Sequence, residues 1–192
     1  MFSKRRNKIA TKNLTIGSSL PDFKLKGTDD KYYSPSTFKD KRIPVIIFSC
    51  NHCPYVQAYE ERIKDLQSEF EAKGVQIIAI NSNEESGYPE DLFENMKKRA
   101  AAKNFNFPYL RDEEQNAAEK FDASHTPEIF VFDNERKLAY HGKIDDNWKE
   151  SEKVKSKYLE DAITQLLEGK EISIPETFSI GCTIKWKKTN LT

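Results

Sequence analysis

Residues 44–54 have the sequence PVIIFSCNHCP, and this stretch decides the fold. Its first part, residues 44–49, is a continuous apolar run rich in β-branched side chains, which is typical of a strand buried on both faces. Cys50 and Cys53 follow directly. Apolar residues then recur at spacings of three and four, which predicts a helix over residues 54–72 that ends at Gly74. Residues 75–81 have the pattern of a second buried strand, so the whole unit predicts a βαβ crossover.

The rest of the chain predicts an α/β domain built around this unit. Hairpins are expected within residues 21–33 and from the pair 128–133 and 137–141. Helices are expected over residues 90–103, 116–121 and 154–167, with a short extended piece at residues 107–110. No linker divides the chain, so we expect a single domain over residues 13–192 behind a basic flexible tail at residues 1–12.

Charge and composition exclude several classes of partner. The chain has 31 Lys and Arg against 31 Asp and Glu, so it has no general attraction to nucleic acid or anionic lipid. No apolar run approaches the roughly 18 residues that span a bilayer, and none follows the basic start as in a signal peptide. Three cysteines are too few, and odd in number, for a disulfide-stapled secreted domain. We therefore expect a cytoplasmic protein with no nucleic-acid or membrane partner.

The CxxC pair has the spacing of a redox-active dithiol. At a helix N-terminus, unpaired backbone N–H groups and the helix dipole stabilise a thiolate. We expect Cys50 to be the exposed attacking thiol and Cys53 to lie deeper and resolve the mixed disulfide. Asn51, His52 and Pro54 are expected to modulate the pair. An imidazolium at His52 would stabilise the Cys50 thiolate, and Pro54 suits the first helical turn, where no N–H is needed.

A CxxC pair is also half of a zinc site, which is the main alternative for these residues. The other half would need a second pair of Cys or His residues at ligand spacing. Cys182 stands alone, and His125 and His141 are scattered. We therefore expect no metal and no cofactor, and the position between strand and helix favours a redox site.

Thr126 and Pro127 precede a predicted strand far from the cysteines in sequence. A proline here could simply begin the strand. Together with the upstream CxxC unit, however, it predicts a cis peptide that faces the dithiol and leaves a backbone edge free to dock a substrate.

Cys182 lies in the tail sequence GCTIKW, residues 181–186. It could be a third redox thiol that folds back on the site, or a small apolar residue in the core. Its spacing leaves both interpretations open.

These landmarks together resemble the thioredoxin-like redoxin family (alkyl hydroperoxide reductase/thiol-specific antioxidant). The matching stretches cover about residues 17–187 and are LPDF at 20–23, CNHCPYV at 50–56, YPED at 88–91, FPYL at 107–110, TP at 126–127, IDDN at 144–147 and GCTIKW at 181–186. The resemblance implies a thioredoxin fold with a central mixed β-sheet, helices on both faces and an N-terminal β-hairpin extension. It gives the dithiol role to Cys50 and Cys53 and the cis-proline role to Pro127, and it favours a functional Cys182.

The chain departs from two better-known patterns of this fold. Ser49 stands where thioredoxin has Trp, Asn51-His52 replaces its Gly-Pro dipeptide, and the preceding strand has no buried Asp. The Thr or Ser that peroxiredoxins carry three residues before the peroxidatic cysteine is replaced by Ile47 before Cys50. These differences put the proton route of thioredoxin and the peroxide activation of peroxiredoxins in doubt here.

Three functions follow from these features. The first is a thiol–disulfide oxidoreductase that acts on disulfides of a protein or small thiol and is served by a thiol reductant. The second is a peroxiredoxin-like, thiol-dependent peroxide reductase, an antioxidant activity in which Cys182 could resolve. The third is a Cu(I)-binding module in which Cys50, Cys53 and His52 would supply soft ligands.

Overall fold

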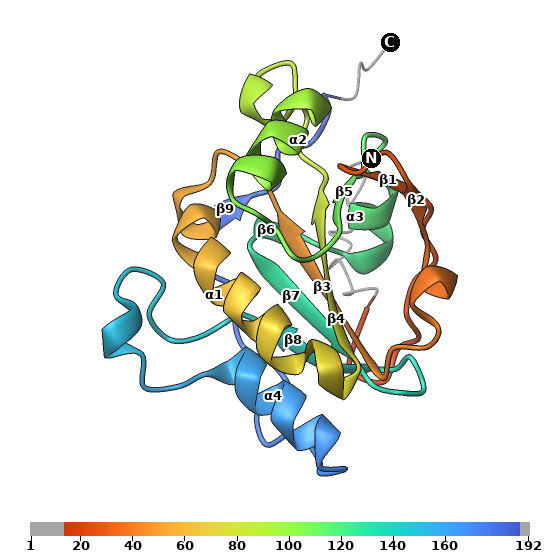
Figure 1. The fold of residues 1–192 in the computed structure, drawn as a ribbon, viewed down its shortest axis with the longest axis vertical. Helices are drawn as coiled ribbons and strands as arrows, with labels where there is room; N and C mark the ends of the chain where they lie inside the picture. Colours follow the sequence, from red (N-terminus) through yellow and green to blue (C-terminus); the bar gives the residue numbers. More distant parts are fainter. Residues whose placement is uncertain (1–13, 189–192) are drawn as a thin grey trace, which may run out of the picture.

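The computed structural model describes residues 14–188. The basic tail predicted for residues 1–12 lies outside this range. Within it, the chain forms a seven-stranded mixed sheet with the order β2-β1-β5-β4-β3-β7-β8, and a separate two-stranded sheet of β6 and β9. Figure 1 shows the strands from the side on which α1 and α4 lie in front.

The centre of the sheet is the unit predicted from residues 44–81. Strand β3 spans Ile43–Ser49 and β4 spans Val75–Asn81; they run parallel, and every residue of both is buried. Helix α1, Pro54–Phe70, connects them. Gly74 ends the connection in the left-handed conformation at φ 87°, which explains a glycine at this position.

Further strands extend this centre on both sides. Strand β5, Tyr109–Arg111, is parallel to β4, and the N-terminal hairpin of β1, Leu25–Gly27, and β2, Tyr32–Tyr33, pairs with β5 in the antiparallel sense. On the other side, β7, Glu128–Phe132, is antiparallel to β3, and β8, Leu138–Gly142, is antiparallel to β7.

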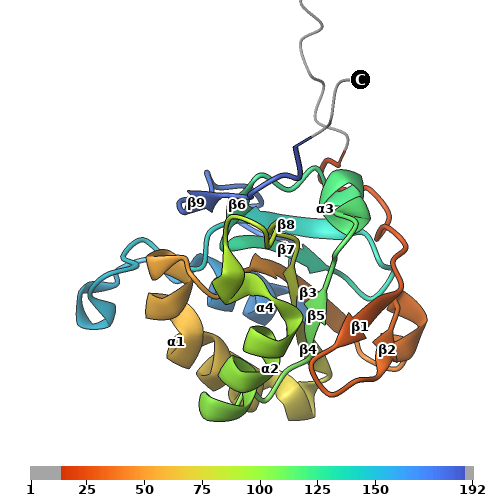
Figure 2. The ribbon, with the colours of Figure 1, turned by 90° about the horizontal axis from the view of Figure 1, so that it is seen from above.

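Helices cover both faces of the sheet, as Figure 2 shows. Alternate strand residues such as Val45 and Ile47 face α1, α2 (Phe93–Ala102) and α4 (Tyr158–Leu167). Ile46 and Phe48 face the opposite side, where α3 (Asn116–Phe121) packs. This alternation follows from the two-residue repeat of a strand and produces one apolar cluster on each face.

The helix predicted from residue 90 begins later than its apolar pattern indicates. Pro89–Asp91 forms a single 3-10 turn, Leu92 is extended, and α2 begins at Phe93. The turn is separate because the Asp91 side chain is buried and used as an acceptor by the loop after β3.

The remaining short strands lie beside the start of α1. Strand β6, His125–Thr126, pairs in the antiparallel sense with β9, Cys182–Thr183, near the end of the chain. Figure 2 shows this pair at the edge of the molecule. In the described part of the chain, no helix is long and apolar enough to cross a membrane.

Candidate redox site

The CxxC pair lies where β3 ends and α1 begins. Cys53 is the residue that caps α1, with φ −73° and ψ 121°, and Pro54 is the first helical residue. The missing N–H of Pro54 costs nothing at this position. The loop therefore places the Cys53 sulfur beside the free N–H groups of the first turn, as its sequence position predicted.

The three cysteines lie together in one buried cluster with Val56. Cys50 and Cys53 are close enough for each to shift the pKa of the other. Cys53 Sγ lies 3.0 Å from Cys182 Sγ, although the two residues are 129 positions apart in sequence. All three are free thiols in this structure.

This arrangement makes Cys53 the most acidic thiol of the three. Its pKa is lowered first by its interaction with Cys50, and also by the Cys182 side chain and the backbone N–H groups of Val56 and Cys182. Burial acts in the opposite direction but is outweighed. The pKa of Cys182 is raised to about 11, through burial and its contact with Cys53.

Cys50 differs from its prediction in exposure and in acidity. Its side chain is 1% exposed, and that of Cys53 is 0% exposed, so the expectation of an exposed attacking thiol is wrong for this arrangement. The pKa of Cys50 is raised, first by its hydrogen bond to Cys53, then by burial and by the negative charge of Asp91. Thr126 Oγ1, 3.3 Å from Cys50 Sγ, is a donor that favours the Cys50 thiolate.

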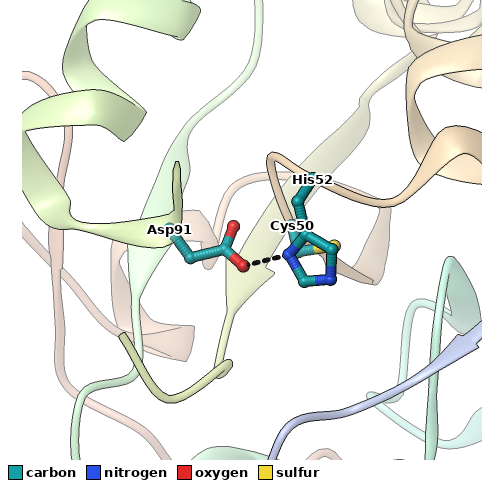
Figure 3. Close-up of side chains that lie close together, drawn as sticks. All are labelled: Cys50, His52 and Asp91. Atoms are coloured by element: carbon teal, nitrogen blue, oxygen red, sulfur yellow. Dashed lines mark hydrogen bonds and ion pairs between the residues drawn. The ribbon is translucent and has the colours of Figure 1, made fainter. Parts of the chain in front are cut away.

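Asp91 is a site residue that the sequence analysis missed. Its carboxylate is 0% exposed and accepts hydrogen bonds from the backbone N–H of Asn51 at 2.6 Å and from the side-chain amides of Asn81 and Asn83, each at 3.0 Å. Figure 3 shows it beside His52, with the Cys50 side chain close behind the imidazole. The chain thus has a buried acid near the dithiol, but from the turn before α2 rather than from β3.

His52 is oriented by Asp91 and by an aromatic neighbour. Its Nδ1 lies 2.6 Å from Asp91 Oδ2 (Figure 3), and its ring stacks on Tyr88 with centroids 4.7 Å apart. Asp91 and Tyr88 thus fix the orientation of the imidazole in the loop between the two cysteines.

Asn51 fixes the loop between the cysteines. Its side-chain amide donates to the backbone carbonyl of Glu90 at 2.7 Å, and its side-chain oxygen accepts from the Tyr109 hydroxyl at 3.0 Å. Its own carbonyl accepts from Gln57 at 2.8 Å. Asn51 therefore ties the CxxC loop to the turn before α2, to β5 and to α1.

The Thr126–Pro127 peptide is cis, as its position before a strand and the upstream CxxC unit together predicted. The Thr126 carbonyl oxygen lies 3.2 Å from Cys53 Sγ, so this peptide does face the dithiol. The expectation of a free backbone edge here is wrong, because Thr126 pairs with Cys182 of β9. Strand β9 of the chain itself occupies this backbone edge.

The segment around β9 is held closely against the site. A Cβ atom on Gly181 would lie 2.1 Å from the Thr126 carbonyl oxygen, so only glycine fits there. Ile184 is buried at 4%, and its N–H donates to the Ser124 carbonyl at 2.9 Å. The Lys185 N–H donates to Asn83 Oδ1 at 2.8 Å. Cys182 is thereby fixed between β6 and the loop after β4.

One group of side chains at the site has the composition of a metal site. Ligand atoms of Cys50, His52 and Asp91 lie within 4.8 Å of one another. The oxygens of Asp91 already accept four hydrogen bonds, however, and a carboxylate is a hard ligand that does not suit the Cu(I) of our third hypothesis. Copper is therefore not favoured at the group of Cys50, His52 and Asp91.

The dithiol lies at the start of the helix that follows β3, a central parallel strand. It faces a cis-proline that directly precedes β7, the antiparallel neighbour of β3. This combination defines a protein of the thioredoxin fold. Residues 16–141 match the AhpC/TSA family. The chain belongs to this family, a redoxin family. The match ends before β9, so the role of Cys182 has to be argued from its geometry.

Solved structures agree with this assignment. A hypothetical protein from Sinorhizobium meliloti 1021 is 32% identical, with a TM-score of 0.87 over 92% of this chain and 97% of that one. An uncharacterized conserved protein from Geobacillus kaustophilus is 37% identical, with a TM-score of 0.86 over 92% and 94%. A thiol:disulfide interchange protein of the thioredoxin family from Chlorobium tepidum TLS, 16% identical with a TM-score of 0.62 over 80% and 98%, shares the fold. No curated protein matches the sequence.

Proposed function

We propose that this redoxin is a thiol–disulfide oxidoreductase in which Cys50 and Cys53 alternate between dithiol and disulfide. The observation that carries the proposal is the position of Cys50 and Cys53, which lie in one buried cluster at the N-terminus of α1. In this scheme Cys50 forms the mixed disulfide with a partner. Cys53 then attacks Cys50, and the partner leaves as a thiol.

The acidity of Cys53 suits this resolving role. A cysteine that is already a thiolate near neutral pH needs no base when it attacks the mixed disulfide. In the reverse direction, a partner thiolate attacks Cys50 and Cys53 leaves, and a leaving thiol of low pKa leaves faster. Both directions therefore use the hydrogen bonds that lower the pKa of Cys53.

The proposed partners are disulfides of a protein or of a small thiol, together with a thiol reductant. Thr126 and Pro127 are proposed to contribute to binding, because the Thr126 hydroxyl and carbonyl contact Cys50 and Cys53 respectively. We place the protein in the cytoplasm, where a free dithiol is maintained.

Disulfide mapping tests the proposal directly. Reduced protein is treated with a mild oxidant such as diamide, alkylated, digested and analysed by mass spectrometry. We expect an internal Cys50–Cys53 disulfide, and we expect Cys50→Ser and Cys53→Ser variants to lose the reduction of a model protein disulfide. The variant Ser86→Ala, in an exposed loop, serves as a control. Absence of the Cys50–Cys53 disulfide in the wild-type protein would refute the proposal.

A peroxide reductase is the second candidate, and one contact favours it. The Thr126 hydroxyl lies 3.3 Å from Cys50 Sγ and supplies a donor that the sequence before Cys50 lacks. Membership of the AhpC/TSA family agrees with this activity. The test is consumption of hydrogen peroxide coupled to a thiol reductant, with Thr126→Val as the variant. A rate no greater than that of free cysteine would exclude this function.

A further inference from the structure

The buried position of the dithiol leaves Cys182 as the one partly exposed cysteine of the site. Cys50 and Cys53 are 1% and 0% exposed, whereas Cys182 is partly exposed. A disulfide reagent has to bring its own sulfur into contact with the sulfur that it oxidises. In the arrangement that the structure describes, a small disulfide can therefore reach Cys182 but neither cysteine of the CxxC pair.

We propose that Cys182 is the exchange thiol through which small disulfides oxidise the buried Cys50–Cys53 pair, by way of an internal Cys53–Cys182 disulfide. This inference rests on the proposed function of the pair. Its geometric basis is the 3.0 Å separation of Cys53 Sγ and Cys182 Sγ. Cysteine residues that form disulfides approach closely across neighbouring backbone segments, which is how β9 and the CxxC loop are held here.

The backbone around Cys182 is built to hold this contact. Thr126 pairs with Cys182 in register, and Gly181 allows the two segments to approach more closely than any other residue would. Buried Ile184 and the backbone hydrogen bond of Lys185 fix the other side of Cys182. Because the residues before and after Cys182 are fixed, its thiol can react with Cys53 with little loss of conformational entropy.

The first exchange step joins the small disulfide to Cys182. The Cys182 thiol passes its proton to the neighbouring Cys53 thiolate and attacks one sulfur of the small disulfide. That S–S bond breaks, and its other half leaves as a thiolate. The protein then carries a mixed disulfide on Cys182.

The second step oxidises the protein. The Cys53 thiol gives its proton to the departed thiolate through solvent and attacks Cys182, and the second half of the small disulfide leaves as a thiolate. One small disulfide has been reduced to a thiol and a thiolate, and the protein has lost two electrons and gained the Cys53–Cys182 bond. Cys53 attacks readily because its pKa is lowered by the contacts described above.

The third step moves the disulfide from Cys53–Cys182 to Cys50–Cys53, and the protein neither gains nor loses electrons. The Cys50 thiolate attacks Cys53, the Cys53–Cys182 bond breaks, and Cys182 leaves and takes up the proton that Cys50 lost. Thr126 Oγ1 contacts Cys50 Sγ at 3.3 Å and favours the thiolate that this step requires. In the reverse direction, the same steps allow a small thiol to reduce the Cys50–Cys53 disulfide.

The test uses oxidised glutathione and the full-length protein. Trypsin is expected to release residues 43–62, with Cys50 and Cys53, and residues 171–185, with Cys182, as separate peptides. In the Cys50→Ser variant we expect glutathione disulfide to link these two peptides. In the Cys53→Ser variant we expect glutathione to remain on the 171–185 peptide.

The rate of oxidation provides the second readout. We expect Cys182→Ser and Cys182→Ala to form the Cys50–Cys53 disulfide at least threefold more slowly than the wild-type protein. Thr183→Ala, an exposed neighbour in β9, is the control and should match the wild-type rate. Either no linked peptides in Cys50→Ser or a slowing of less than threefold in both Cys182 variants would overturn the inference.

The same samples separate this inference from the proposed function. If diamide gives the Cys50–Cys53 disulfide in every protein that has both residues, the proposed function stands even where the Cys182 results fail. If diamide gives no Cys50–Cys53 disulfide in the wild-type protein, the proposed function fails. If glutathione disulfide still links the two peptides of Cys50→Ser in that case, only the exchange between Cys53 and Cys182 is supported.

Discussion

His52 Nδ1 and Asp91 Oδ2 are 2.6 Å apart, so the histidine between the two cysteines is paired with a buried carboxylate. This pairing connects the CxxC loop to the turn before α2 and fixes the orientation of the imidazole beside Cys50. It also places a negative charge close enough to raise the pKa of Cys50. The electrostatics of the pair are therefore asymmetric, with Cys53 acidic and Cys50 not.

Replacing the buried carboxylate should make Cys50 more acidic. Asp91→Asn removes the charge that disfavours the Cys50 thiolate, so the pKa of Cys50 should fall. Thiolate absorbance near 240 nm measures this pKa in a Cys53→Ser, Cys182→Ser background, where Cys50 is the sole thiol.

The matched control for this titration is Glu90→Gln, which removes an exposed charge from the same turn. The Asn variant should also lose roughly 1–3 kcal/mol of stability, because an amide cannot accept all the hydrogen bonds that Asp91 accepts. An unchanged or higher pKa of Cys50 in the folded Asn variant would contradict this account.

The acidity of Cys53 predicts a pH-dependent stability of the reduced protein. Above its lowered folded-state pKa, Cys53 is a thiolate in the folded protein, whereas in the unfolded chain it stays protonated up to about pH 8.5. Between these values the unfolded state binds more protons, so the free energy of unfolding should rise with pH, by at most about 1.4 kcal/mol per unit. This contribution is complete above the unfolded pKa and is lost as pH falls through the folded pKa.

Denaturant unfolding between pH 5 and 8, in the presence of a phosphine reductant, measures this contribution. Cys53→Ser should flatten the rise, and Thr183→Ala should not. Parallel pH profiles for wild type and Cys53→Ser would show that the Cys53 thiolate is not preferentially stabilised in the folded state.

The close approach of β9 predicts a strong effect of a single methyl group. Gly181→Ala places a Cβ against the Thr126 carbonyl oxygen, and Thr126 is held in the β6–β9 pair. Overpacking of this kind costs roughly 1–3 kcal/mol, and here the loss should fall on the docking of β9. We expect faster alkylation of Cys182 and Cys53, measured peptide by peptide in the reduced protein. Alkylation rates equal to those of wild type would mean that the strand accommodates the methyl group.

The stabilised Cys53 sulfur also predicts the direction of the redox couple. Stabilisation of the thiolate favours the reduced dithiol, which makes its disulfide a stronger oxidant. We expect the reduction potential of the Cys50–Cys53 couple to be more positive than the roughly −270 mV of thioredoxin. Equilibration with glutathione buffers, read by disulfide mapping of residues 43–62, measures it. A potential at or below that of thioredoxin would rule out net stabilisation of the dithiol.

The sequence predicted the fold well because its decisive signals are local and periodic. The apolar run before Cys50 and the helical spacing after Cys53 correspond to β3 and α1 within two residues at each end. The cis form of Pro127 was predicted from its place before β7 together with the upstream CxxC unit. These features depend on neighbours in the sequence, which a single chain displays.

The electrostatics of the site could not be predicted in the same way. Asp91 is one of many acidic residues in the sequence, and its burial depends on hydrogen bonds from Asn51, Asn81 and Asn83. The burial of Cys50 and the acidity of Cys53 depend on the packing of Cys182, which comes from the other end of the chain. Only the departure of Asn51-His52 from the thioredoxin dipeptide indicated that the surroundings of the dithiol would differ.

The long separation between Cys53 and Cys182 has a consequence for the growing polypeptide. A chain is synthesised from its N-terminus, and domains begin to form as segments emerge from the ribosome. The β3–α1–β4 unit is complete well before residues 181–186 are made, so the dithiol of a nascent chain has no β9 beside it. During translation the two CxxC thiols therefore meet the surrounding solution directly, and their chemistry at that stage is that of an unassisted pair.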